Sequence, residues 1–219
     1  MKKVVVLNAS PRKNFNTAKL LKEAQRGAEI SGAEVEYFNL YDFNFKGCYS
    51  CFACQRKGST TEGICAIKDD LKPILEKCLA ADAIIIGTPV YFSYPTGIFR
   101  SFVERLMFAN HTYMVDKENG GLKRRLDKTI PVGVIFTMNC PKELAEQINY
   151  PTILDENVKA LNHIMGYAEG LYSYDTTQFA DFSKYNCDLF DENHKREVQQ
   201  TQFPKDLENA FNLGKKLIQ

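Results

Sequence analysis

Residues 3–17 read Lys3-Val4-Val5-Val6-Leu7-Asn8-Ala9-Ser10-Pro11-Arg12-Lys13-Asn14-Phe15-Asn16-Thr17. The first half, Lys3–Ala9, is a short apolar run rich in β-branched residues, which is typical of a buried parallel strand. A polar loop, Ser10–Asn16, follows it directly. Apolar residues then recur at helical spacing, at Ala18, Leu20, Leu21, Ala24, Ala28 and Ile30. A strand that leads through a polar loop into a helix is the opening unit of an α/β fold.

The rest of the chain repeats this alternation. Further strands are expected at Glu34–Leu40, Asp82–Gly87, Thr129–Thr137 and Gly170–Tyr174. Helices are expected after Asp69-Asp70, from near Pro95, at about Ile153–Met165 and at Pro204–Ile218. Alternating strands and helices predict a parallel sheet with right-handed crossovers. We therefore expect a flavodoxin-like three-layer α/β/α sandwich with a five-stranded parallel sheet in the order 2-1-3-4-5. Its ligand crevice should lie at the carboxyl ends of strands one, three and four.

The 219 residues show no internal repeat, low-complexity segment or linker that would divide them. We expect a single domain over 1-219, with a cysteine-rich loop at 46-66 and insertions near 108-126 and 176-203. Both insertions are rich in aromatic residues, so they are candidates for a lid or a subunit interface.

Composition narrows the functional classes. The net charge is +1, and charged residues make up 25% of the chain. This balance gives no argument for nucleic acid or membrane partners. The apolar run at the N-terminus stops at Asn8, which is too short for a signal peptide. Seven cysteines without an export signal favour a reducing compartment, so we expect a cytoplasmic protein.

The loop after the first strand has the character of an anion site. Backbone N–H groups at a helix N-terminus bind anions, and Ser10, Asn16 and Thr17 add short polar groups. Arg12 adds a guanidinium able to grip a phosphate through two N–H groups. The loop has neither the P-loop pattern nor the dinucleotide G-x-G-x-x-G pattern. Taken alone, it is equally consistent with an ordinary helix cap and polar turn.

Two more loops are expected at the same edge of the sheet. The first contains Pro89, Val90, Tyr91 and Phe92, in which proline stiffens the chain and aromatic residues offer a flat surface for a planar ring. The alternative is a hydrophobic loop that covers the sheet end. The second is Met138-Asn139-Cys140-Pro141, which follows the fourth strand.

Four cysteines, Cys48, Cys51, Cys54 and Cys65, follow the spacing C-x2-C-x2-C-x10-C. Four convergent thiolates are the ligand set of an iron–sulfur cluster, and structural zinc uses a similar set. Three closely spaced cysteines with a distant fourth favour a cubane cluster over zinc. Thiols that line the site without a metal remain a third interpretation.

These loops together resemble those of the flavodoxin-fold NAD(P)H-dependent FMN reductases, and within them the iron–sulfur flavoprotein branch. The resemblance covers about residues 2–140 and rests on Ser-Pro-Arg…Asn-Thr, Thr-Pro-Val-Tyr and the compact cysteines. It implies that Ser10, Arg12, Asn16 and Thr17 hold the FMN phosphate. It also implies that Pro89, Val90, Tyr91 and Phe92 border the ring, and that Cys48, Cys51, Cys54 and Cys65 ligate a [4Fe-4S] cluster. Two features depart from the branch, namely the long Cys54–Cys65 spacing and Met138-Asn139-Cys140 in place of small residues.

The same resemblance implies an oxidoreductase that passes electrons from NAD(P)H, or from a ferredoxin-type donor, through FMN to a small acceptor such as a quinone or a flavin. It implies a homodimer or homotetramer, and it requires no catalytic side chain. Two alternatives belong to other classes: a flavodoxin-like electron carrier, and a thiol or metal redox sensor without substantial turnover.

Overall fold

The computed structural model describes residues 1–118 and 120–219. Its central sheet has five parallel strands in the order β2-β1-β3-β5-β6, as predicted. Their bounds are β1 Lys3–Asn8, β2 Glu34–Asn39, β3 Ala83–Tyr91, β5 Val132–Thr137 and β6 Ala168–Ser173. The carboxyl ends of β1, β3 and β5 are therefore adjacent at one edge, where a ligand crevice is expected.

A sixth strand, β4 (Tyr94–Pro95), was not predicted. It pairs antiparallel with the end of β3. The two residues between these strands, Phe92 and Ser93, have φ angles of 50° and 75°. Two-residue hairpin turns with positive φ usually carry glycine or asparagine, so Phe-Ser gave no sequence signal for this turn.

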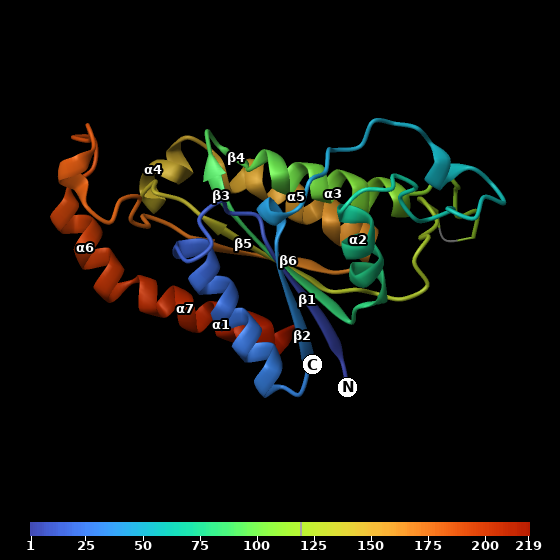
Figure 1. Ribbon diagram of the computed structural model, residues 1–219, viewed down its shortest axis with the longest axis horizontal. Helices are drawn as coiled ribbons and strands as arrows, with labels where there is room; N and C mark the ends of the chain where they lie inside the picture. The colour runs from blue at the N-terminus through green and yellow to red at the C-terminus, as the bar shows by residue number, and fades with distance from the viewer. Residues whose placement is uncertain (119) are drawn as a thin grey trace.

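Helices cover both faces of the sheet (Figure 1). On one face, α1 and α7 share a hydrophobic core with the side chains of Val4 and Val6. On the other, α2, α3 and α5 share a core with Val5 and Leu7. The two sets of β1 side chains alternate because successive residues of a strand point to opposite faces. The helix bounds are α1 Asn16–Ile30, α2 Leu71–Ala80, α3 Gly97–Asn110, α5 Tyr150–Met165 and α7 Phe203–Lys216.

The helices α1 and α7 approach each other closely through two glycines. A Cβ atom on Gly27 would lie 2.0 Å from the carbonyl oxygen of Phe211. A Cβ atom on Gly214 would lie 1.9 Å from the carbonyl oxygen of Ala24. Since real Cβ contacts are never this short, only glycine permits this helix pair.

Two helices were missed by the sequence prediction. These are α4, Lys142–Gln147, and α6, Glu192–Thr201, the latter within the predicted insertion 176–203. The α6 sequence, ENHKREVQQT, has one apolar residue, and its buried side chain is Lys195 rather than a hydrophobic one. This sequence therefore has no periodic pattern of apolar residues from which a helix could be predicted.

Among the described residues, the remaining elements are three short 3₁₀ turns, η1 Leu40–Asp42, η2 Ala53–Gln55 and η3 Phe182–Lys184. The predicted insertion near 108–126 contains an antiparallel bridge between Val115 and Leu122, and its residue 119 lies outside the described residues. Within the described ranges, no helix has the length and apolar character needed to cross a membrane.

Candidate functional site

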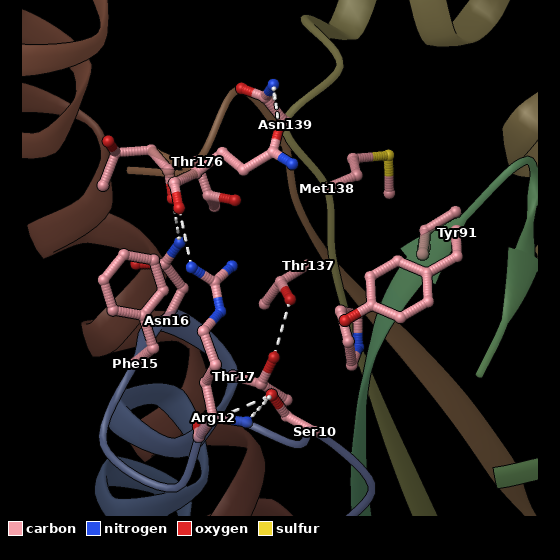
Figure 2. Close-up of a pocket in the computed structure, with 14 residues that line it drawn as sticks. Ser10, Arg12, Phe15, Asn16, Thr17, Tyr91, Thr137, Met138, Asn139 and Thr176 are labelled. Carbon is pink, nitrogen blue, oxygen red and sulfur yellow. Dashed lines mark hydrogen bonds between the residues drawn. The ribbon is translucent and has the colours of Figure 1, made fainter. Parts of the chain in front are cut away.

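The three predicted loops meet in one pocket at the carboxyl ends of β1, β3 and β5 (Figure 2). The segment after β6 closes its fourth side. The lining residues are Ser10, Arg12, Phe15, Asn16, Thr17, Pro89, Val90, Tyr91, Thr137, Met138, Asn139, Thr176, Thr177 and Gln178. Seven of the eight residues predicted to hold a cofactor are therefore brought together. The eighth, Phe92, is outside this lining and is 94% exposed.

The first loop forms a polar cradle beneath this pocket. Ser10 is buried, and its hydroxyl accepts the backbone N–H of Arg12 at 3.2 Å. The hydroxyls of Thr17 and Thr137 are 2.7 Å apart, so they tie the start of α1 to the end of β5. Phe15 precedes α1 and makes no side-chain cap. The first-turn N–H groups of α1 therefore remain available to an anion.

The segment Thr176–Gln178 lies against this cradle. Arg12 donates from Nη1 to the carbonyl of Gln178 at 2.6 Å, and its guanidinium stacks 4.0 Å from the centre of the Phe15 ring. Asn16 donates from Nδ2 to the carbonyl of Thr177 at 2.7 Å. Two of the predicted phosphate-binding side chains thus also hold the segment that closes the pocket, as Figure 2 shows.

Two buried amide oxygens at this site need a donor. The Oδ1 atoms of Asn16 and Asn139 make no hydrogen bond to any described residue. A buried acceptor without a partner costs about 1–3 kcal/mol, so such atoms mark places where a ligand or water completes the site. FMN carries hydroxyls and a ring N–H that can serve as donors. The residues present therefore fit this cofactor.

Threonines fix the loop after β3. Thr96 donates its hydroxyl to the carbonyl of Ala9 at 3.0 Å, and its N–H donates to the hydroxyl of Thr88 at 3.1 Å. These bonds join the loops that follow β1 and β3. Both threonines are buried; Thr88 begins the Thr-Pro-Val-Tyr motif, but the sequence analysis assigned a role to neither residue.

The loop after β5 is held by a buried charged group that was also missed. Lys195 of α6 is 1% exposed and donates to the carbonyl of Asn139 at 2.5 Å and to the carboxylate of Asp175. The other oxygen of Asp175 lies 2.6 Å from Nε2 of His194. Asp175 itself has a φ of 55°. The ion pair between a buried lysine and an aspartate with positive φ indicates that the loop after β5 has a fixed conformation.

The four predicted metal ligands converge on a second, smaller cavity. Cys48, Cys51, Cys54 and Cys65 all line it; Cys54 and Cys65 are buried, and Cys51 is exposed. Burial, followed by the charges of Cys65, Cys51 and Cys48, raises the pKa of the Cys54 thiol. Within the segment from Cys48 to Cys54, Ser50 and Phe52 each have a φ of 57°, so the chain turns sharply at both residues.

In kind, four thiols that line one cavity suit a thiolate-bound metal group. Among the described residues, however, no three His, Cys, Asp or Glu side chains have an arrangement that would hold a metal ion. The four cysteines line one cavity, and the binding of a metal by them stays a prediction.

Relatives of this chain are flavoproteins. An iron-sulfur flavoprotein of Archaeoglobus fulgidus is 39% identical over 107 residues, covering 49% of this chain and 50% of that protein. One from Methanocaldococcus jannaschii is 36% identical over 103 residues, covering 47% and 51%. The chain thus spans about half the length of the curated relatives it matches.

Solved structures share the fold. An NAD(P)H:quinone oxidoreductase from Methanothermobacter marburgensis superposes with a TM-score of 0.67 at 18% identity, covering 100% of this chain and 98% of that chain. An azoreductase from Bacillus anthracis gives 0.69 at 14% identity, covering 99% and 100%. At these identities the likeness concerns the fold alone. The sequence pattern of one family extends over residues 2–122, more than half of the chain, and the protein belongs to that family, the NADPH-dependent FMN reductases.

Proposed function

We propose that this protein is an FMN-dependent oxidoreductase that takes electrons from NAD(P)H, or from a ferredoxin-type donor, and passes them to a small acceptor such as a quinone or a flavin. The observation that carries the proposal is the meeting of three loops at the carboxyl edge of the sheet, with a polar cradle at one end and Pro89, Val90 and Tyr91 at the other. This polarity matches a cofactor with a phosphate at one end and a planar ring at the other.

Each loop has a distinct task. The start of α1, with Ser10, Arg12, Asn16 and Thr17, binds the phosphate through N–H groups, hydroxyls and one positive charge. The loop after β3 supplies an apolar wall for the ring. When bound, FMN supplies the chemistry of accepting a hydride from a nicotinamide and releasing the electrons singly or as a pair. The protein orients the cofactor, so no side-chain acid or base is required.

The cysteine loop is proposed to hold a [4Fe-4S] cluster through Cys48, Cys51, Cys54 and Cys65. Support comes from the shared cavity of the four side chains and from the similarity to iron-sulfur flavoproteins. Zinc and metal-free thiols are the other outcomes. A homodimer or homotetramer is part of the same proposal.

The test is an absorption spectrum of the anaerobically purified full chain, followed through titration with NADPH and then dithionite. Flavin bands that NADPH bleaches are expected, together with a broad iron–sulfur shoulder that acid removes. Bands that only dithionite bleaches favour an electron carrier. Iron, sulfide and zinc analysis on the same sample separates the three outcomes for the cysteine loop. A chain that takes up no FMN, even when FMN is added, contradicts the proposed function.

A further inference from the structure

One arginine lies behind the cysteine cavity and is not explained by FMN binding. Arg105 belongs to α3, and its side chain is fully buried. It lines the cavity of the four cysteines and donates from Nε to the sulfur of Cys65 at 3.3 Å. A buried arginine that donates to a thiol is a costly arrangement unless its charge is offset.

The rest of the guanidinium joins the two ends of the cysteine loop. Nη1 and Nη2 donate to the two carboxylate oxygens of Asp69, at 2.5 and 2.9 Å, and Nη1 also donates to the carbonyl of Lys46 at 3.3 Å. Asp69 in turn accepts the N–H of Leu71 at 3.2 Å, which fixes it at the start of α2. The Arg105 side chain is therefore held rigidly, with Nε–H directed at one sulfur.

We propose that Arg105 is a positioning residue for the metal group of the cysteine loop. Its Nε–H holds the Cys65 sulfur toward the shared cavity, and its positive charge offsets the negative charge that four thiolates gather there. Hydrogen bonds and charges around ligating sulfurs set both the stability and the reduction potential of a cluster. This inference rests on the cluster part of the proposed function and is independent of FMN.

A simpler interpretation is that the Arg105–Asp69 ion pair only holds the two ends of loop 46–66 together. The two readings differ in one respect. Loop closure affects how much cluster the protein holds, whereas a charge and an N–H bonded to sulfur also change the electronic properties of the cluster that is held. The decisive measurements are therefore made on the bound cluster.

The experiment uses the full chain, loaded with FMN and reconstituted anaerobically with iron and sulfide. Arg105→Met removes the positive charge and the N–H donors. Arg105→Lys keeps the charge but removes the planar guanidinium that donates to Asp69 and Cys65 at the same time. The matched control is Arg100→Met on the same helix, whose guanidinium contacts Asn157 and Glu104 and not a cysteine. FMN binding and far-ultraviolet circular dichroism verify that each variant is folded.

Arg105→Met is expected to shift the cluster midpoint potential to a more negative value, because the reduced cluster carries one more negative charge. It should also lose iron to a chelator about 10-fold faster than the wild type. Arg105→Lys should keep a potential near that of the wild type while losing iron faster. Arg100→Met should match the wild type in both measurements.

A second measurement does not depend on any variant. In wild-type protein labelled with ¹⁵N-arginine, pulsed electron paramagnetic resonance of the reduced cluster should detect a ¹⁵N coupling. An absent coupling, or an unchanged potential in folded Arg105→Met, overturns the inference. A wild-type chain that binds FMN but takes up no iron also overturns it, while the flavin function stands. A chain that binds no FMN refutes the proposed function instead.

Discussion

At the scale of single residues, Arg12 connects two parts of the pocket. Its backbone N–H bonds to Ser10 in the first loop, and its guanidinium bonds to the carbonyl of Gln178 after β6. A phosphate in the cradle would compete with that carbonyl for the guanidinium, and the doubly charged ligand is the stronger acceptor.

Arg12→Ala should therefore weaken FMN binding. Hydrogen bonds to a charged partner contribute about 1.5–3 kcal/mol, which corresponds to a roughly 10- to 100-fold higher Kd. Quenching of flavin fluorescence on titration of the apoprotein measures this. The control is Lys13→Ala, which removes a neighbouring half-exposed cation paired with Asp42 and should leave Kd nearly unchanged. An equal Kd for both variants would mean that the cradle holds the phosphate without Arg12.

Lys195 is the second residue whose contacts decide local stability. Lys195→Met leaves the carboxylate of Asp175 without its buried partner, so we expect a loss of about 3 kcal/mol in the free energy of unfolding. Chemical denaturation measures it. Arg196→Met, on the same helix but on an exposed side chain paired with Glu192, should cost less than about 0.5 kcal/mol. Adding Asp175→Asn to Lys195→Met should recover part of the loss, and equal effects of the two single variants would contradict this role.

At the scale of elements, the contact between α1 and α7 depends on the absence of two Cβ atoms. Both helices pack on the same face of the sheet, and α1 also carries the anion cradle at its start. The position of the cradle therefore depends on how closely α1 and α7 approach each other.

Gly214→Ala should force the two helices apart, because the new Cβ would lie 1.9 Å from the carbonyl oxygen of Ala24. This oxygen belongs to the backbone of α1, so it cannot move aside as the end of a flexible side chain could. Overpacking of this kind costs about 1–3 kcal/mol, so the midpoint of denaturation should fall clearly. Asn212→Ala, on the exposed side of α7, is the control and should stay within about 0.5 kcal/mol of the wild type. A Gly214→Ala variant as stable as the control would show that the helix pair can shift without cost.

At the scale of the whole molecule, stability at alkaline pH should depend in part on the phenol of Tyr37. Burial raises the pKa of Tyr37 to about 12, whereas it is 10.0 without that burial. The unfolded chain thus loses this proton first. The contribution of Tyr37 to stability is constant below pH 10 and is progressively lost as pH rises toward 12.

Tyr37→Phe should remove that loss. Between pH 9 and pH 12 the free energy of unfolding of the variant should rise by about 1–2 kcal/mol relative to that of the wild type. This is less than the full change in the Tyr37 pKa would give, because the ring is only partly buried. Urea denaturation at several pH values measures the difference. Tyr185→Phe, at a side chain that is 55% exposed, should show a pH dependence like that of the wild type. A constant difference between Tyr37→Phe and the wild type across this range would contradict the assignment.

The sequence by itself determined the sheet order, the main helices, the three loops of the pocket and the gathering of four cysteines. These features follow from local signals: runs of Val and Ile, helical spacing of apolar residues, and cysteines close together in the chain. Topology then places consecutive βα loops at one edge of a parallel sheet. Boundaries moved by a few residues, as with β5, which begins at Val132 rather than Thr129.

Only the tertiary structure decided which distant groups complete these sites. The Gln178 carbonyl that Arg12 holds lies 166 residues away in the chain, and the Cys65 sulfur that Arg105 holds lies 40 away. Lys195 and Arg105 are polar residues on helices, and their sequence pattern predicts solvent exposure. Their burial depends on partners that the fold brings to them, Asp175 in one case and Asp69 in the other, because a buried charge is stable only when another part of the chain offsets it.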